Sequence, residues 1–315
     1  LRTDPIEGIH YIHDETNILR GYSLIIGPPD SPYEGGYYLF LFDFPQNYPF
    51  SPPKLTFYTN DGLVRMHPNL YKNGKVCLSI LNTWSGESWT GCQTISSVLL
   101  TIRSIMTTNP LLHEPGIDKF HRDFYIYSEI VRYKNIDLAM LYILKNEELN
   151  VYFRELINIA KRDFIDNYDK KMEIAKKSRD LFIESENNIR LEGKVLYTNI
   201  YNMRCIVDYN LLMIEMENIN DIFYMNVIPI YIDSLIRITQ LPESSNVDLS
   251  TIDGLCKTKQ IGDIEQINEI IAPSEKGITE NVPVAIIAEN LAFGEMASKV
   301  KEKSINVLDF LYDDD

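Results

Sequence analysis

The sequence lacks long hydrophobic runs, and it has too little positive charge for a nucleic-acid-binding protein. No apolar stretch approaches the roughly 20 residues that cross a bilayer. The start of the chain, Leu1 to Ile9, is polar and contains Pro5 and Gly8, which does not fit the pattern of a secretory leader. The net charge is −15, whereas phosphate binding needs clustered lysine and arginine. We therefore expect neither a membrane nor a nucleic acid as a partner.

Cysteine is also scarce, with 4 residues in a chain of 315. No two cysteines form a C-x-x-C pair, and the histidines are not spaced to complete a zinc site with them. Scattered cysteines in a chain of this length do not make a disulfide framework, so we expect a reduced intracellular location, cytoplasmic or nuclear. We also expect no metal and no cofactor. The cysteines are Cys77, Cys92, Cys205 and Cys256.

Hydrophobic spacing predicts a sheet followed by helices. Residues 20–60 have the pattern of a β-meander, with an inner strand at Tyr37 to Phe44 because this run is apolar on both faces. A helix follows that begins at Thr94, is capped by Thr94 or by the polar residues just before it, and is stopped by Asn109-Pro110. Beyond it, apolar residues at helical spacing predict further helices at 123–145, 147–187, 194–218 and 221–240.

Residues 61–89 show no periodicity and are long for a structureless connection, which is typical of a functional loop. In this loop Asn69 lies 8 residues before Cys77. A cysteine attacks carbonyls and gives a thioester that still reacts with amines, and an asparagine amide is a suitable donor to the oxyanion of acyl transfer. A cysteine protease would also need a histidine base, for which His67 and His113 are the candidates. A transferase that takes its acyl group from another thioester needs no strong base, because thiol exchange is nearly balanced.

Three motifs around this loop resemble the signature of ubiquitin-conjugating enzymes. The motifs are His67-Pro68-Asn69 with Gly74 to Leu81 and Trp89, the strand–turn–strand segment Gly27 to Gly36, and the ligase-facing loop Tyr48 to Lys54. The resemblance covers about residues 5–145. It implies an α/β fold in which an antiparallel four-stranded meander sheet has flanking helices. The helical spacing that follows adds an all-α C-terminal extension.

The resemblance implies roles for the residues of the loop. Cys77 would carry ubiquitin or a ubiquitin-like protein as a thioester, received from a ubiquitin-activating enzyme and passed to a substrate lysine or a ligase cysteine. Asn69 would stabilise the oxyanion or hold the active-site loop, and His67 would shape the turn. Glu114, with His113 beside it, falls where the family places an acidic residue near the incoming lysine, where a carboxylate orients the amine and favours its deprotonation. A solvated surface acid is the alternative for Glu114.

The resemblance also implies a partner-binding surface that joins Phe50 and Pro52 to Thr90 and Gly91. Thr90-Gly91-Cys92 stands where many members have Ser-Pro-Ala, so binding to the common RING ligases does not follow from the resemblance. The family's first helix, where the activating enzyme docks, is expected just before Asp4 and would precede the sequence given. Protein substrates complete the expected partners.

Within the family, the chain is similar to the Z-type conjugating enzyme and to the conjugating domain of the giant apoptosis inhibitor called apollon or BRUCE. The features that indicate this are a longer stretch between Cys77 and Trp89, the segment Ile95 to Leu99, and the segment Asn109 to Gly116. The Z-type enzyme also continues into a helical C-terminal extension.

The expected organisation is a catalytic core at 1–145, a helical extension at 146–240, a linker at 241–291, and a terminal helix with an acidic tail at 292–315. Because the acidic excess lies mostly in the second half, we expect the extension to select partners rather than to perform chemistry. Two rival functions stay open. One is a non-catalytic variant that presents ubiquitin, against which Cys77 argues. The other is a ubiquitin-binding scaffold whose conjugating domain is vestigial.

Overall fold

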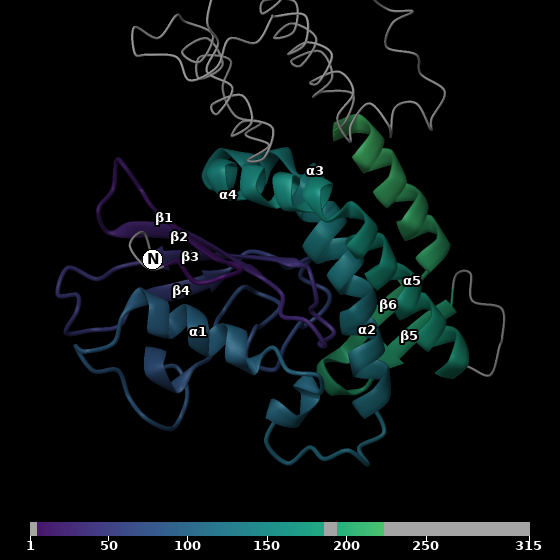
Figure 1. Ribbon diagram of the computed structural model, residues 1–315. Coiled ribbons are helices and arrows are strands. Elements are labelled where there is room, and N and C mark those ends of the chain that lie inside the picture. Colours follow the sequence, from purple (N-terminus) through teal and green to yellow (C-terminus); the bar gives the residue numbers. More distant parts are fainter. Residues whose placement is uncertain (1–4, 186–193, 224–315) are drawn as a thin grey trace, which may run out of the picture. The chain divides into compact units, whose positions relative to one another are not determined.

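The computed structural model describes residues 5–185 and 194–223. The chain divides into two compact units, Leu1–Asn220 and Asp221–Asp315. The architecture given below is that of the first unit (Figure 1). Three expected segments lie wholly or largely outside the described residues: 221–240, 241–291 and 292–315.

Four antiparallel strands form the main sheet in the order β1-β2-β3-β4, so that each strand pairs with its neighbour in the chain. This confirms the four-stranded meander, and β3 is the inner strand that its apolar faces predicted. The spacing did not locate β1, an edge strand in which Ile9 is the one fully buried residue. The strands are β1 (Ile9–His13), β2 (Arg20–Ile26), β3 (Tyr37–Asp43) and β4 (Lys54–Phe57).

Neighbouring tyrosines of β3 contact different helices on the two faces of the sheet. Successive residues of a strand point to opposite faces, and Tyr37 and Tyr38 are both fully buried. The Tyr37 hydroxyl donates to Asp163 of α4 (Glu147–Asp166) at 2.9 Å. The Tyr38 hydroxyl donates to Asn135 of α2 (Phe124–Ile136) at 2.5 Å. Helices that follow the sheet in the chain therefore pack against both of its faces.

Helix α1 (Ile95–Ile105) begins at the residue that the sequence predicted. The Thr94 hydroxyl accepts from the Ser97 N–H at 3.1 Å, and the Ser97 hydroxyl accepts from the Thr94 N–H at 2.9 Å, which makes a reciprocal capping box. The helix ends earlier than expected, because Met106 leaves the helical region with ψ 64°. The short 3₁₀ helix η2 (Pro110–His113) then starts at a proline, which suits a first helical turn.

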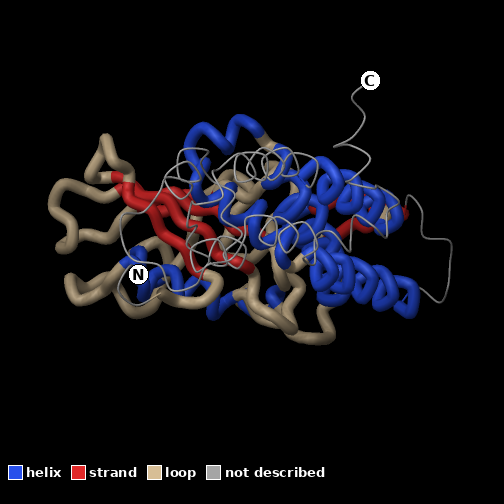
Figure 2. The backbone as a smooth tube through the Cα atoms, turned by 45° about the horizontal axis from the view of Figure 1, so that its top comes forward, coloured by secondary structure: helices blue, strands red, loops and turns tan. Residues whose placement is uncertain are grey.

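The helices predicted at 123–145 and 147–187 are present, but the second of them is two helices. Helix α2 runs through a π-helical stretch, η3 (Asp137–Tyr142), into α3 (Ile143–Lys145). Helix α4 ends before Asn167, and α5 (Tyr168–Ser185) follows it. Figure 2 shows the main sheet towards one end of the unit and most of the helical chain towards the other. None of the helices in the described ranges is long and apolar enough to cross a membrane.

The extension is not all helical, which corrects one expectation. In place of the helix expected at 194–218, the structure has an antiparallel hairpin of β5 (Lys194–Thr198) and β6 (Met203–Val207). A helix follows over residues 209–223. Side chains of the hairpin alternate between buried and exposed, which is the period of two that a strand requires. Its buried side chains are Leu196, Thr198, Met203, Cys205 and Val207.

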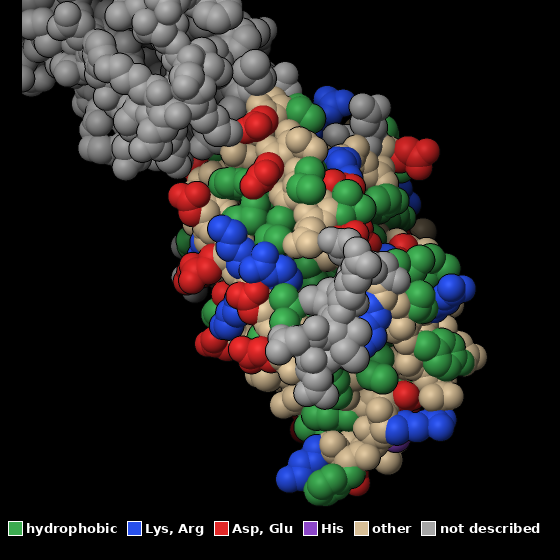
Figure 3. Space-filling model, turned by 90° about the vertical axis from the view of Figure 1, so that its right-hand side faces the viewer, with side chains coloured by type: hydrophobic (Ala, Val, Ile, Leu, Met, Phe, Trp, Pro, Cys, Tyr) green, Lys and Arg blue, Asp and Glu red, His purple; other side chains and the backbone are tan. Residues whose placement is uncertain are grey.

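The outer face of the hairpin leaves Val195, Tyr197 and Ile206 exposed. Figure 3 views this side of the unit, where hydrophobic side chains lie among charged ones. An apolar residue on the outer face next to one on the inner face blurs the alternation, so the spacing of the sequence favours a helix.

Phe153 joins α4 to the sheet, and its removal is expected to destabilise the protein. Its ring is 2% exposed and lies 5.3 Å from the ring of Tyr22 and 5.1 Å from that of Tyr58. Phe153→Ala should lower the free energy of unfolding by about 3–5 kcal/mol, measured by urea denaturation. Tyr152→Ala, at a side chain that is 60% exposed, is the matched control and should change it by less than about 0.5 kcal/mol. Equal effects of the two changes would contradict this packing.

Candidate active site

The loop between β4 and α1 carries the motif residues and is irregular, as predicted, except for one short 3₁₀ helix, η1 (Ser79–Leu81). Isolated bridges hold it together: Thr56 pairs with Lys75, and Leu70 pairs with Val76. The backbone N–H of Cys77 donates to the carbonyl of Asn69 at 2.9 Å. These contacts fold the chain back on itself between the two residues, so that the Asn69 side chain reaches the main chain of Cys77.

Asn69 and Cys77, which the sequence predicted as partners, are in direct contact. The Asn69 side-chain amide donates to the main-chain carbonyl of Cys77 at 2.6 Å. This contact has the geometry of a residue that holds the active-site loop. A carboxamide nitrogen has two hydrogens, so the bond to Cys77 leaves a second donor on the same side chain.

The Cys77 thiol is covered by the chain that follows it. The residue is 2% exposed, and its sulfur donates to the carbonyl of Thr83 at 2.8 Å. The Thr83 hydroxyl accepts from the Leu78 N–H at 2.8 Å and lies 3.1 Å from the Val76 carbonyl. Thr83 thus ties the segment after Cys77 back over it.

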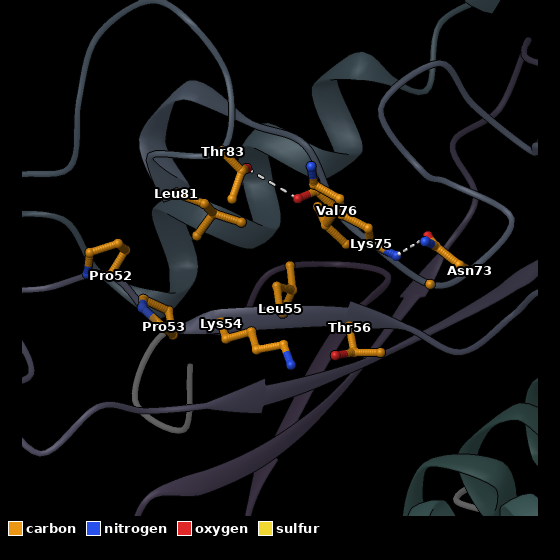
Figure 4. Close-up of a pocket in the computed structure, with 11 residues that line it drawn as sticks. Pro52, Pro53, Lys54, Leu55, Thr56, Asn73, Lys75, Val76, Leu81 and Thr83 are labelled. Carbon is orange, nitrogen blue, oxygen red and sulfur yellow. Dashed lines mark hydrogen bonds between the residues drawn. The ribbon is translucent and has the colours of Figure 1, made fainter.

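A cavity of about 550 Å³ lies beside this loop (Figure 4). Val76 and Thr83 face it from the side of Cys77, and Leu55 and Thr56 of β4 face it from the sheet. Its remaining lining residues are Pro52, Pro53, Lys54, Asn73, Gly74, Lys75 and Leu81.

His67 and His113 form a ring pair in which His67 is buried and His113 is exposed. His67 is fully buried, and burial lowers its pKa well below the usual value, so the ring is neutral. Its Nδ1 accepts from the Asn69 N–H at 3.0 Å, which fits the expected turn role. The His113 ring lies 5.0 Å from that of His67, and its Nε2 lies 3.3 Å from the hydroxyl of Thr107. Burial also lowers the pKa of His113.

Glu114 lies at the end of η2 and has a partner that the sequence did not indicate. It is half-buried, and the hydroxyl of Tyr201 donates to its Oε2. Across the described part of the chain, neither Glu114 nor His113 hydrogen-bonds to Cys77. The candidate site therefore has two parts, the Asn69–Cys77 loop and the segment that carries His113 and Glu114. The His67–His113 ring contact joins them.

Residues 1–124 match the family described as ubiquitin-conjugating enzyme. These residues are a ubiquitin-conjugating domain. The human ubiquitin-conjugating enzyme E2 Z is 35% identical over 216 residues, which are 68% of this chain and 58% of that protein. The Xenopus tropicalis protein of the same name is 42% identical over 147 residues, 46% of this chain and 47% of that protein. The human dual E2 ubiquitin-conjugating enzyme/E3 ubiquitin-protein ligase BIRC6 is 40% identical over 148 residues, 43% of this chain and 3% of that protein.

These matches confirm the family and the subgroup that the motifs predicted. The chain spans less than two thirds of each of these relatives. The similarity to the human E2 Z protein runs over 216 residues, more than the 124 of the conjugating domain, so it includes part of the extension.

The conjugating domain brings together the two loops that were expected to bind a partner. The Trp89 indole N–H donates to the carbonyl of Pro49 at 2.7 Å, which joins the loop of Phe50 to the one that begins at Thr90. Phe50 is 84% exposed, and Thr90 and Gly91 are exposed beside it. Pro52 is half-buried at the base of the same loop.

The other cysteines of the described residues do not resemble Cys77 in surroundings. Cys92 is exposed and follows the Thr90-Gly91 loop. Cys205 is buried in the hairpin, and burial raises the pKa of its thiol to about 12. Cys256 lies outside the described ranges. No cluster of three metal-binding side chains occurs within those ranges.

Proposed function

We propose that the protein accepts ubiquitin or a ubiquitin-like protein from an activating enzyme as a thioester on Cys77, and then transfers it to a substrate lysine or a ligase cysteine. The observation that carries the proposal is the contact of Asn69 with Cys77 at 2.6 Å, inside a domain of the conjugating family. This contact puts an amide donor on the residue that carries the nucleophilic thiol, and a thiol and an amide donor are the groups that acyl transfer needs.

Loading is an exchange between two thioesters. The Cys77 sulfur attacks the carbonyl carbon that the activating enzyme holds, the new carbon–sulfur bond forms, and the bond to the activating enzyme's sulfur breaks. That sulfur takes up the proton that the Cys77 thiol gives away, so no oxidant or further reactant is used. Because Cys77 is 2% exposed under Thr83, the segment after Cys77 moves aside for this step.

Transfer to lysine passes through a tetrahedral oxyanion. The lysine nitrogen attacks the thioester carbonyl, the Cys77 sulfur leaves, and an amide remains. The second amide hydrogen of Asn69 is the donor for the oxyanion, while the first keeps its bond to the Cys77 carbonyl. Glu114 orients the incoming ammonium group and favours loss of its proton. His113, neutral and in ring contact with His67, supports the segment that carries Glu114.

The exposed loops carry the partner surface in this proposal. Phe50 projects into solvent beside Thr90 and Gly91, and an exposed aromatic side chain is a common anchor in protein binding. A ubiquitin ligase is the partner assigned to this surface. The activating enzyme and protein substrates are the other partners.

A thioester assay tests the proposal. The full chain is incubated with an activating enzyme, ATP and ubiquitin, or with a ubiquitin-like protein and its own activating enzyme, and separated with and without reductant. An adduct that reductant removes, and that peptide mass spectrometry locates on Cys77, is the expected result. Binding of ubiquitin without any such adduct, across the panel of ubiquitin-like proteins, would favour the scaffold with a vestigial conjugating domain.

A further inference from the structure

The tip of the β5–β6 hairpin rests on the conjugating domain. The tip contains η4 (Ile200–Asn202). The carboxylate of Asp123 accepts from the Ile200 N–H at 2.8 Å and lies 3.4 Å from the side-chain nitrogen of Asn199. The Lys72 ammonium donates to the carbonyl of Tyr201 at 2.7 Å and lies 3.3 Å from that of Asn202. The hairpin is thus fixed to the conjugating domain by its backbone as well as by side chains.

Tyr201 is the central residue of this contact. Its backbone is left-handed, with φ 60°, a conformation that costs a non-glycine residue about 1–2 kcal/mol. The Arg65 guanidinium carbon lies 4.1 Å from the Tyr201 ring centre and 3.7 Å from that of Tyr71, so the cation is held between two rings. The Tyr201 hydroxyl donates a hydrogen bond to the Glu114 carboxylate. Strained backbone is common at functional sites, and here the strained residue hydrogen-bonds to a titratable side chain of the candidate site. This combination indicates that Tyr201 has a role in the site.

Arg65 extends the contact to the other part of the site. Its guanidinium donates to the carbonyl of Pro68, the residue before Asn69. Its main-chain N–H donates to the sulfur of Met203 at 3.2 Å, at the start of β6. The hairpin therefore contacts both parts of the site, Glu114 directly and the turn of Asn69 through Arg65.

We propose that Tyr201 of the extension is a positioning residue that fixes Glu114 for transfer to lysine, so that the hairpin completes the active site of the conjugating domain. This inference rests on the proposed function and assigns a role to a residue beyond the conjugating domain. The hydroxyl occupies Oε2 of Glu114 and leaves Oε1 to face the lysine ammonium group. A carboxylate that accepts a hydrogen bond on one oxygen loses rotational freedom, which keeps the second oxygen in one place.

The Tyr201 hydroxyl is a constant donor. Burial, and then the hydrogen bond to Glu114, raise the pKa of Tyr201 above its usual value. The phenol therefore keeps its proton at any pH at which lysine transfer occurs, and the bond to the carboxylate does not depend on a titration of Tyr201.

Tyr201→Phe tests this role, because it removes the donor and keeps the ring against Arg65. Loading of Cys77 should be unchanged, whereas single-turnover discharge to free lysine should slow about 10-fold, the expected loss for one hydrogen bond to a charged group. Discharge to hydroxylamine, which is uncharged at neutral pH and needs no carboxylate partner, should stay as in the wild type. Tyr197→Phe is the matched control, since that phenol is in the same hairpin and contacts Asn202 at 3.1 Å instead of Glu114.

Glu114→Gln, alone and combined with Tyr201→Phe in a double variant, tests whether Tyr201 acts through Glu114. If Tyr201 acts through Glu114, the double variant discharges no more slowly than Glu114→Gln alone. Equal slowing of lysine and hydroxylamine discharge in Tyr201→Phe would show a merely structural role and overturn the inference. Normal lysine discharge in Tyr201→Phe, together with slow lysine discharge in Glu114→Gln, would also overturn the inference. That result would leave the proposed function intact. Normal discharge in Glu114→Gln removes the role of both residues, and absence of any Cys77 thioester in the wild type removes the proposed function itself.

Discussion

Replacing Cys77 by serine is expected to turn the reductant-sensitive ubiquitin adduct into a reductant-resistant one, and replacing it by alanine should abolish the adduct. Serine puts a hydroxyl in place of the thiol, so any acyl group is held as an oxygen ester, which thiols exchange far less readily than a thioester. Alanine has no nucleophile. The measurement is electrophoresis with and without reductant after incubation with activating enzyme, ATP and ubiquitin.

Cys92→Ser is the matched control for this prediction. Cys92 is an exposed thiol 15 residues further along the chain, and the same change there should leave the thioester as in the wild type. A thioester that persists in Cys77→Ala, or one that disappears in Cys92→Ser, would place the acceptor on another thiol and contradict the assignment of Cys77. The alanine variant also loses the thiol's bond to Thr83, so its thermal unfolding should be compared with that of the wild type.

The local features of the site were predictable from the sequence because their partners are close in the chain. Asn69 and Cys77 lie 8 residues apart, and the Thr94 cap and Ser97 lie 3 apart. At such separations, the identity and spacing of the residues carry most of the geometry. The irregular loop was predictable for a related reason, since it lacks the periodicity that any regular element would leave.

The contacts of the extension were not predictable in the same way. Tyr201 and Glu114 are 87 residues apart, and a hydrogen bond between distant residues leaves no periodic pattern in either segment. The sequence spacing predicts a helix in place of the hairpin that brings them together. What decides its conformation is the burial of alternate side chains against α2 and its neighbours, which is a tertiary effect that overrides local preference.

The same long-range contacts tie the extension to the core expected at 1–145. The Lys171 ammonium is buried, pairs with Asp163 at 2.6 Å and donates to the carbonyl of Gly35 at 2.7 Å. The Tyr37 hydroxyl donates to the same Asp163 carboxylate. Burial lowers the pKa of Lys171, and a buried amine of this kind needs the hydrogen bonds it has. Residues on both sides of position 145 thus share one compact unit, Leu1–Asn220.

Asn69→Ala is expected to slow discharge to lysine by about 100- to 1,000-fold, the usual loss for one oxyanion donor, while loading of Cys77 persists. Loading exchanges one thioester for another and is nearly balanced, whereas the attack of an amine depends more on stabilisation of the oxyanion. Single-turnover discharge of purified thioester, compared with the initial rate of loading, separates the two steps.

Asn73→Ala is the control, because Asn73 is an exposed asparagine of the same loop whose side chain accepts from the Lys75 N–H at 3.1 Å. It should leave both rates close to those of the wild type. The structure shows the Asn69 amide on the Cys77 carbonyl at 2.6 Å, so the loop-holding role predicts a different pattern. If Asn69 only holds the loop, Asn69→Ala releases the Cys77 backbone and slows loading and discharge equally. A loss confined to discharge instead requires that the second amide hydrogen reaches the oxyanion, and the ratio of the two rates decides between the roles.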